Sequence, residues 1–230
     1  MTTSLVAAGA CRVPWGPAAD GLPGAAPAEL PGLTGFVLSR FNPLIADVVV
    51  DCLGEPGSPH DLTTGRADRT AIVLATTYGD TTTSDVATQR LVAGQVHSPL
   101  LFFQSVTTSV LGHLARQYGI TGPISCISTG ADPAAEALTL ADLLLAEDDA
   151  DQVLVVGVET AANERVDWIH ERVDEQGGFG PLPYGDAAVA LLLRRGGEGT
   201  AAPKSRSWPQ YGWLAPLVQL ITDHDLRSSK

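Results

Sequence analysis

The sequence predicts an α/β fold with a mostly parallel, five-stranded sheet and flanking helices. Five short runs of β-branched and apolar residues alternate with segments of helical periodicity, and such alternation favours parallel pairing. Two of the runs, "TAIVLATT" (70–77) and "QVLVVGV" (152–158), are apolar almost throughout, which is typical of strands covered on both faces. The hydrophobic fraction of 44% in 230 residues is sufficient for a sizeable buried core.

In chain order, the first strand is expected at "SLVAAGACRVPW" (4–15). The stretch 17–32 is too rich in Pro, Gly and Ala for a regular element. A helix is predicted over 42–53, because Asn42 is a good N-cap and Gly54 is a good terminator.

The strand at 70–77 is followed by two predicted helices. The first covers 84–94, with Ser84 as its cap. The second covers 104–118, where apolar residues recur at helical spacing until Gly119 ends the element.

The later elements complete the sheet. They are a strand "ISCIS" (124–128), a helix over 133–147, the strand at 152–158 and a last strand "AAVALLL" (187–193). After residue 196 we expect loop, apart from the short apolar segment "YGWLAPLVQLI" (211–221). The chain is therefore divided into a domain of residues 1–196 and a tail of residues 197–230.

The helix over 133–147 carries a polar stripe. Asp132, Glu136, Thr139 and Asp142 recur at three- and four-residue steps, which places them along one side. Because unpaired buried acids are costly, we expect this stripe to face water or a polar partner. The segment 211–221 is expected to fold back over part of the apolar flank.

Composition excludes several classes of function. The formal net charge of −12 opposes binding to nucleic acids or anionic membranes. Cys11, Cys52 and Cys126 are widely scattered, which fits a reducing cytoplasm and indicates neither a disulfide framework nor a metal site. The N-terminus lacks the basic region of a signal peptide, and no apolar run reaches membrane-spanning length. We therefore expect a soluble, cytoplasmic protein without metal or cofactor.

Several blocks of the sequence carry a family likeness. "SPLLFFQSVTTSV", the following "GH", the turn "YGITGP" and "GPLPYGDAAVALLLRR" keep the order and spacing seen in one family. Over roughly residues 70–195 the chain resembles the N-terminal half of the β-ketoacyl synthases of the thiolase superfamily. The resemblance implies a thiolase-like half domain.

The resemblance also shows a departure at the catalytic position. "STGA" (128–131) stands where the family has "STAC", so Ala131 occupies the place of the catalytic cysteine. Cys126 lies inside the strand and is expected to be a structural thiol. In the family, two catalytic histidines and an oxyanion loop come from a C-terminal half that has no counterpart here. We therefore expect no condensing activity and no catalytic residue of the usual kind.

The side chains around this turn have two interpretations each. Asp132 is either a helix N-cap or a recruited acid or base. Ser128 and Thr129 are either turn hydroxyls bonded to the backbone or nucleophiles. His113 is expected to pack within a helix, and His170 is expected on the surface.

Phe102 and Phe103 belong to a segment that, by the resemblance, lies at the dimer interface and borders the acyl pocket, together with Val106 and Thr107. Two interpretations stay open. These aromatic side chains either plug or reshape that pocket, or they pack in the core under the sheet.

Three functional hypotheses follow. The first is a catalytically inactive ketosynthase-like partner or scaffold in type II polyketide, polyene or fatty-acid biosynthesis. It resembles chain-length-factor subunits, although theirs usually carry Gln where this chain has Ala131, and it is also similar to short ketosynthase-like N-terminal proteins beside polyene synthases. The second is a repurposed enzyme that hydrolyses, cyclises or isomerises a carrier-bound acyl chain near Asp132. The third is a split synthase with a separate C-terminal chain.

The partners implied by the resemblance are a ketosynthase subunit, an acyl carrier protein, or both. In the family, the strand that matches 124–128 pairs with its counterpart across a two-fold axis. We therefore expect a homodimer or a heterodimer.

Overall fold

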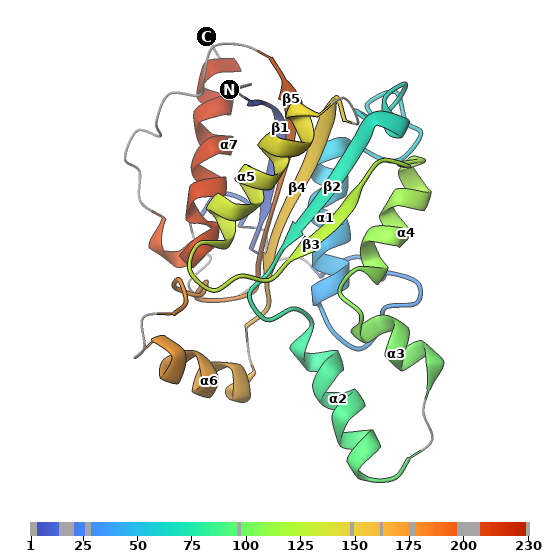
Figure 1. Ribbon diagram of the computed structural model, residues 1–230, viewed down its shortest axis with the longest axis vertical. Helices are drawn as coiled ribbons and strands as arrows, with labels where there is room; N and C mark the ends of the chain where they lie inside the picture. The colour runs from blue at the N-terminus through green and yellow to red at the C-terminus, as the bar shows by residue number, and fades with distance from the viewer. Residues whose placement is uncertain are drawn as a thin grey trace.

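The computed structural model describes residues 4–13, 21–25, 29–95, 98–147, 150–161, 163–174, 178–196 and 208–228. One five-stranded sheet forms its centre, with the strand order β1-β5-β4-β2-β3 (Figure 1). The strands are β1 (Ser4–Arg12), β2 (Thr70–Ala75), β3 (Ile124–Ile127), β4 (Gln152–Glu159) and β5 (Ala187–Arg195). The predicted α/β class and the five strands are confirmed.

The sheet is mixed. The parallel pairing that we expected for most of the sheet is found only among β2, β3 and β4. Strand β2 pairs in parallel with both β3 and β4, whereas β5 runs antiparallel to both β4 and β1. The chain between β4 and β5 forms α6 (Glu164–Asp174) beyond the end of the sheet and does not cross a sheet face (Figure 1). Without a crossover, β5 returns beside β4 in the opposite direction.

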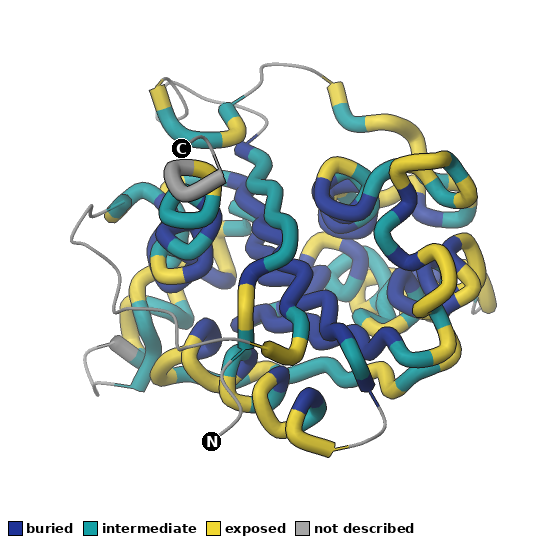
Figure 2. The backbone as a smooth tube through the Cα atoms, turned by 90° about the horizontal axis from the view of Figure 1, so that it is seen from above, coloured by how far each residue is buried: buried dark blue, intermediate teal, exposed yellow. Residues whose placement is uncertain are grey.

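Helices form a layer on each face of the sheet (Figure 2). Helices α1 (Phe41–Leu53) and α4 (Ser109–Tyr118) pack on one face, in a cluster that contains Ile72, Leu154 and Leu192. Helix α5 (Pro133–Ala146) packs on the other face, over the alternate strand residues. Successive side chains of a buried strand point to opposite faces of the sheet. The same three central strands therefore contribute residues to both clusters.

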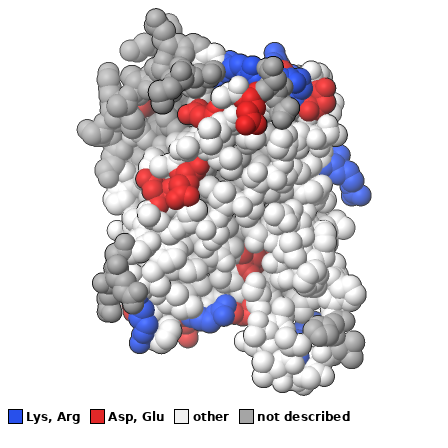
Figure 3. Space-filling model, in the orientation of Figure 1, with Lys and Arg blue, Asp and Glu red and all other residues white. Residues whose placement is uncertain are grey.

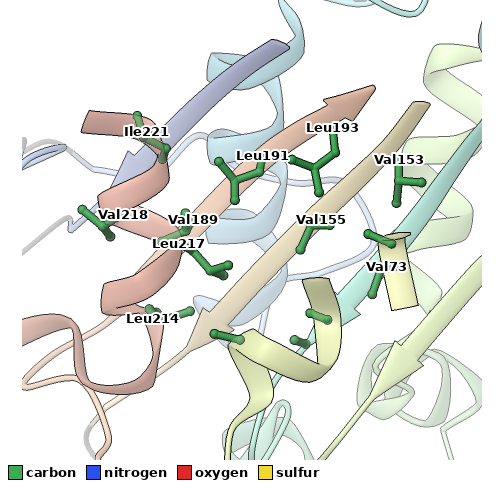
Figure 4. Close-up of a cluster of buried hydrophobic side chains, with 14 of the residues drawn as sticks. Val73, Val153, Val155, Val189, Leu191, Leu193, Leu214, Leu217, Val218 and Ile221 are labelled. Atoms are coloured by element: carbon green, nitrogen blue, oxygen red, sulfur yellow. The ribbon is translucent and has the colours of Figure 1, made fainter. Parts of the chain in front are cut away.

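Helix α7 (Ala215–Ser228) shares the second face with α5. Leu214 of the preceding segment and Leu217, Val218 and Ile221 of α7 belong to the same cluster as side chains of β4 and β5, and Leu217 lies beside Val189 of β5 (Figure 4). The preceding 3-10 helix η3 (Pro209–Leu214) belongs to the same cluster. The expectation that residues 211–221 fold back over the α5 side is confirmed, and the helix continues over residues 222–228, where we expected loop. Residues 197–207 of the predicted tail lie outside the described residues.

Two N-caps differ from the prediction. Helix α1 begins one residue early, and Asn42 does not cap it, because its side-chain amide donates to Asp80 at 3.2 Å. Helix α2 (Thr81–Val92) is capped by Asp80, whose carboxylate accepts from the Thr83 amide at 3.0 Å, and Ser84 lies inside the helix. Asp80 thus joins the starts of both helices.

The single helix predicted over 104–118 is two helices. Helix α3 (Pro99–Ser105) is capped by Ser98 and ends at Val106, and α4 starts at Ser109. Helices α2 and α3 project from the end of the sheet as an arm, which we call the α2–α3 arm (Figure 1). Within the described residues, no helix is both long and apolar enough to span a membrane.

Candidate functional site

The turn between β3 and α5 is built as the sequence predicts. Asp132 is the N-cap of α5, and its Oδ1 accepts from the Ala135 amide at 3.0 Å, with Pro133 in the first helical position. Ala131 immediately precedes this cap and is exposed. A nucleophile at this position would stand at the positive end of the helix dipole. The structure presents a methyl group there.

A neighbouring backbone segment lies directly against this turn. The Gly180 amide donates to the Gly130 carbonyl at 2.8 Å. A Cβ atom on Gly130 would stand 2.5 Å from the Gly178 carbonyl oxygen and 3.1 Å from the ring of Phe179. Only glycine fits such a close backbone approach. The segment 178–180 therefore covers one side of the turn.

The hydroxyl and thiol groups near the turn show no sign of activation. Ser128 donates its hydroxyl to the Thr77 carbonyl at 2.8 Å, as expected of a turn hydroxyl. Thr129 Oγ1 is buried and has no hydrogen-bond partner among the described residues. Burial raises the pKa of the half-buried Cys126 thiol above its usual value, so this thiol stays protonated at neutral pH and is a poor nucleophile.

An aromatic group beside the turn was missed by the sequence reasoning. The Tyr78 hydroxyl is hydrogen-bonded to His170 Nδ1 at 3.1 Å, and the Tyr78 ring stacks on Phe179 with centroids 5.8 Å apart. Burial, followed by the nearby charge of Glu159, raises the pKa of Tyr78. His170 was expected on the surface, and it is instead partly buried in this aromatic group. The partners come from two distant segments, Tyr78 after β2 and His170 with Phe179 between β4 and β5, which no local motif connects.

Glu159 is a second group that the sequence reasoning missed. It ends β4, is 5% exposed, and accepts from the Thr77 amide, from Trp213 Nε1 at 3.2 Å and from Thr76 Oγ1 at 3.3 Å. Burial raises its pKa from 4.5 to about 7, although these hydrogen bonds act in the opposite direction. A carboxylate that directly follows an apolar strand was the available signal. Glu159 joins the ends of two strands to the C-terminal segment.

The aromatic pair on the α2–α3 arm is not packed under the sheet, so that interpretation is wrong. Phe102 is 73% exposed and borders a groove of about 200 Å³ between α2 and α3. Phe103 is 44% exposed and lies against Phe36, with ring centroids 5.3 Å apart. Val106 and Thr107 are half-buried at the junction with α4.

His113 packs within α4, as expected. Its ring meets the edge of Phe36 at 6.0 Å, and burial together with the charge of Arg116 lowers its pKa. Among the described residues, no group of three or more His, Cys, Asp or Glu side chains is arranged to hold a metal ion.

The comparisons with known proteins agree with this geometry. The sequence profile of the family described as "Beta-ketoacyl synthase, N-terminal domain" matches residues 59–211. No curated protein sequence matches the chain significantly.

Solved structures share the fold. A structure of the ketosynthase ApeO in complex with its chain length factor ApeC, from Xenorhabdus doucetiae, matches with 22% identity and a TM-score of 0.59, covering 85% of this chain and 80% of the matched one. The matched chain is therefore similar in length to this one.

Two longer chains also match. The ishigamide ketosynthase/chain length factor matches with 15% identity and a TM-score of 0.61, covering 84% of this chain and 62% of its own. A β-ketoacyl synthase from Burkholderia phymatum matches with 14% identity and a TM-score of 0.60, covering 85% of this chain and 60% of its own. This chain thus spans about three fifths of these two relatives.

Proposed function

Because the chain belongs to the family of β-ketoacyl synthase N-terminal domains, we propose that it is a non-catalytic ketosynthase-like subunit. Its role is that of a partner or scaffold in type II polyketide, polyene or fatty-acid biosynthesis. The observation that carries the proposal is Ala131 at the head of α5, because a methyl group cannot attack a thioester. A fold shared with a structure that contains a ketosynthase and its chain length factor supports a partner of this kind.

The exposed apolar surface of the α2–α3 arm supports a role in association. Leu91, Val92, Leu100 and Phe102 are each more than half exposed and lie on the two helices of the arm. Contiguous apolar surface is uncommon on proteins that act alone and marks interaction sites. We assign this surface to contact with a ketosynthase subunit, and an acyl carrier protein would join the complex through that subunit.

The direct test of the proposal is an assay for condensing activity. The purified protein is incubated with malonyl- and acyl-loaded carrier proteins and examined by intact mass spectrometry. We expect neither an elongated product nor an acyl adduct, and an adduct would contradict the role assigned to Ala131. Ala131→Cys is expected to remain inactive in condensation, because the resemblance implies that the reaction also requires two histidines and an oxyanion loop, which this substitution does not add.

Association is tested with a ketosynthase from the producing organism. Phe102→Asp places a charge on the arm and is expected to weaken co-purification at least tenfold, because burying the carboxylate at a contact is costly. Tyr184→Asp is the matched control, since Tyr184 is 68% exposed and lies outside the arm. Equal loss in both variants, or in neither, would argue against the arm as the contact surface.

An enzyme with new chemistry is the second candidate. The hydrogen bond between Tyr78 and His170 beside the turn favours it, because a phenol–imidazole pair can move a proton. Asp132 is the other candidate base, although it already caps α5. Asp132→Asn and His170→Ala are assayed separately in the reconstituted pathway. A scaffold tolerates both changes, whereas a repurposed enzyme loses product in at least one.

A further inference from the structure

Residues 178–184, which we call the lid, lie between the turn before α5 and the 3-10 helix η3. Their first residues cover one side of the turn. Toward η3, the Trp213 amide donates to the Pro181 carbonyl at 2.7 Å, and the Tyr184 amide donates to the Gln210 carbonyl at 3.0 Å. Backbone hydrogen bonds therefore hold the lid on both sides.

The fit between the lid and η3 leaves no room for a side chain at Gly212. This residue has a φ of +52°, and a Cβ atom on it would stand 2.3 Å from the Pro181 carbonyl oxygen. Only glycine fits such a close approach. A larger residue at this position would therefore push the lid away from η3 without changing any ionisable group.

A buried carboxylate lies under the lid. Glu159 Oε1 accepts from Trp213 Nε1 at 3.2 Å and from two groups just after β2, and the hydrogen bonds that the described residues make to this side chain all reach that oxygen. Glu159 also lines a cavity of about 60 Å³, to which Leu182 and Pro183 of the lid contribute. A cavity of this size with partly polar walls has room for water. The lid thus closes the space beside the carboxylate.

Within the described residues, positive charge is scarce around Glu159. The ionisable groups that face or adjoin it come from the end of β2, from α6 and from the start of β5, and they are Tyr78 with its partner His170, Asp167, and Asp186 with its partner Arg40. Arg40 lies 3.0 Å from Asp186, so its charge is compensated there. On the surface that carries α5, basic side chains also lie toward the periphery and acidic ones nearer the middle (Figure 3). Burial therefore outweighs the hydrogen bonds and raises the pKa of Glu159 from 4.5 to about 7.

We propose that residues 178–184 form a lid whose closure depends on the protonation of Glu159. When this carboxyl group loses its proton, the lid and Trp213 separate, and water enters the cavity and solvates the charge. The closed form holds the proton more tightly than the open form does, because opening exposes the group to water. Closure is therefore most favourable below pH 4.5 and weakens as the pH rises to about 7, by about 300-fold in total.

The opening is local, and the sheet and α1 stay folded. The open form uncovers the side of the turn at Gly130, so a ligand or partner that needs this side binds more readily at neutral pH than at acidic pH. The lid involves neither the ketosynthase contact nor the chemistry at Ala131. The inference therefore does not depend on the proposed function.

Amide hydrogen exchange, followed by NMR between pH 5 and 8, tests the lid. The Gly180 and Trp213 amides report on its two sides, and the amide of Val49, a fully buried residue of α1, reports on global unfolding. After correction for base-catalysed intrinsic exchange, the opening constants of the two lid amides should exceed that of Val49 at every pH. They should rise about tenfold per pH unit up to pH 7 and then level off.

Two variants sharpen the test. In Glu159→Gln, which cannot ionise, the rise should disappear. In Gly212→Ala, the opening constants of the two lid amides at pH 5 should increase at least tenfold relative to that of Val49, because the lid is displaced without a change of charge. Lid amides that exchange at the rate of Val49 at every pH would overturn the proposal, and so would an equal rise in Glu159→Gln. The wild-type comparison requires no substitution, so it is decisive even if a variant fails to fold.

Discussion

The two faces of the central sheet are covered by helices of different composition. On one face, α1 buries large side chains, among them Phe41, Leu44 and Ile45, which are fully buried. On the other face, α5 buries mainly alanines, with Leu145 as its one large, fully buried residue. Small side chains let α5 lie close to the strands, and its opposite side, with Glu136 and Leu143, faces solvent. The first face therefore carries much of the stability, whereas the outer side of α5 on the second face stays exposed.

Truncation on the α1 face is expected to have the largest effect on stability. Leu44 is fully buried between α1 and the sheet. Leu44→Ala should lower the free energy of unfolding by about 4 kcal/mol, because it removes apolar contacts and leaves a cavity. Urea denaturation followed by circular dichroism measures the change. A loss below about 1 kcal/mol would mean that this face is not the tightly packed one.

Glu159 is expected to make the free energy of unfolding depend on pH. It lies on the second face, where it accepts a hydrogen bond from Trp213 at the start of the C-terminal segment. Its pKa is raised from 4.5 to about 7, so the folded state holds the proton more tightly than the unfolded state. The contribution to stability is complete below pH 4.5 and is lost as the pH rises through 7, by about 3 kcal/mol in total.

The matching variant is Glu159→Gln, which cannot ionise. Melting temperatures measured between pH 4.5 and 8 should fall with pH more steeply for wild type than for this variant. Parallel curves for the two proteins would show that Glu159 does not supply the dependence.

What the sequence predicted well depends on local physics. All five strands were found because each is a short apolar run with turn residues around it, and the cap at Asp132 was found because Asp-Pro is a local signal. The missed features depend on distant contacts. Asn42 bonds to Asp80 instead of capping its helix, and the Tyr78–His170 pair joins segments that lie 92 residues apart.

Two further features could not be predicted from local sequence patterns. They are the break between α3 and α4 and the antiparallel direction of β5. Helical periodicity continues across residues 106–108, yet the chain turns there, since Val106 adopts an extended conformation. Strand direction follows from the path of the connection, which periodicity does not encode. The absence of a nucleophile at Ala131, by contrast, was visible directly in the sequence.

The cap of α5 is expected to contribute a smaller amount. Asp132→Ala removes the acceptor for the Ala135 amide and should cost about 1 kcal/mol of unfolding free energy. Asp142→Ala is the control on the same helix, because Asp142 is exposed and caps nothing. Chemical denaturation of both variants separates the cap from the loss of one acid. Equal costs would show that charge, not capping, is responsible.

The smallest effect on stability is expected at Leu143, the exposed counterpart of Leu44. Leu143→Ala should change the free energy of unfolding by less than about 0.5 kcal/mol, because a side chain that is 58% exposed gives up little buried area when it is shortened. The same urea denaturation used for Leu44→Ala provides the measurement. If Leu143→Ala costs as much as Leu44→Ala, the outer side of α5 is covered in solution, and the two faces are not distinguished by burial.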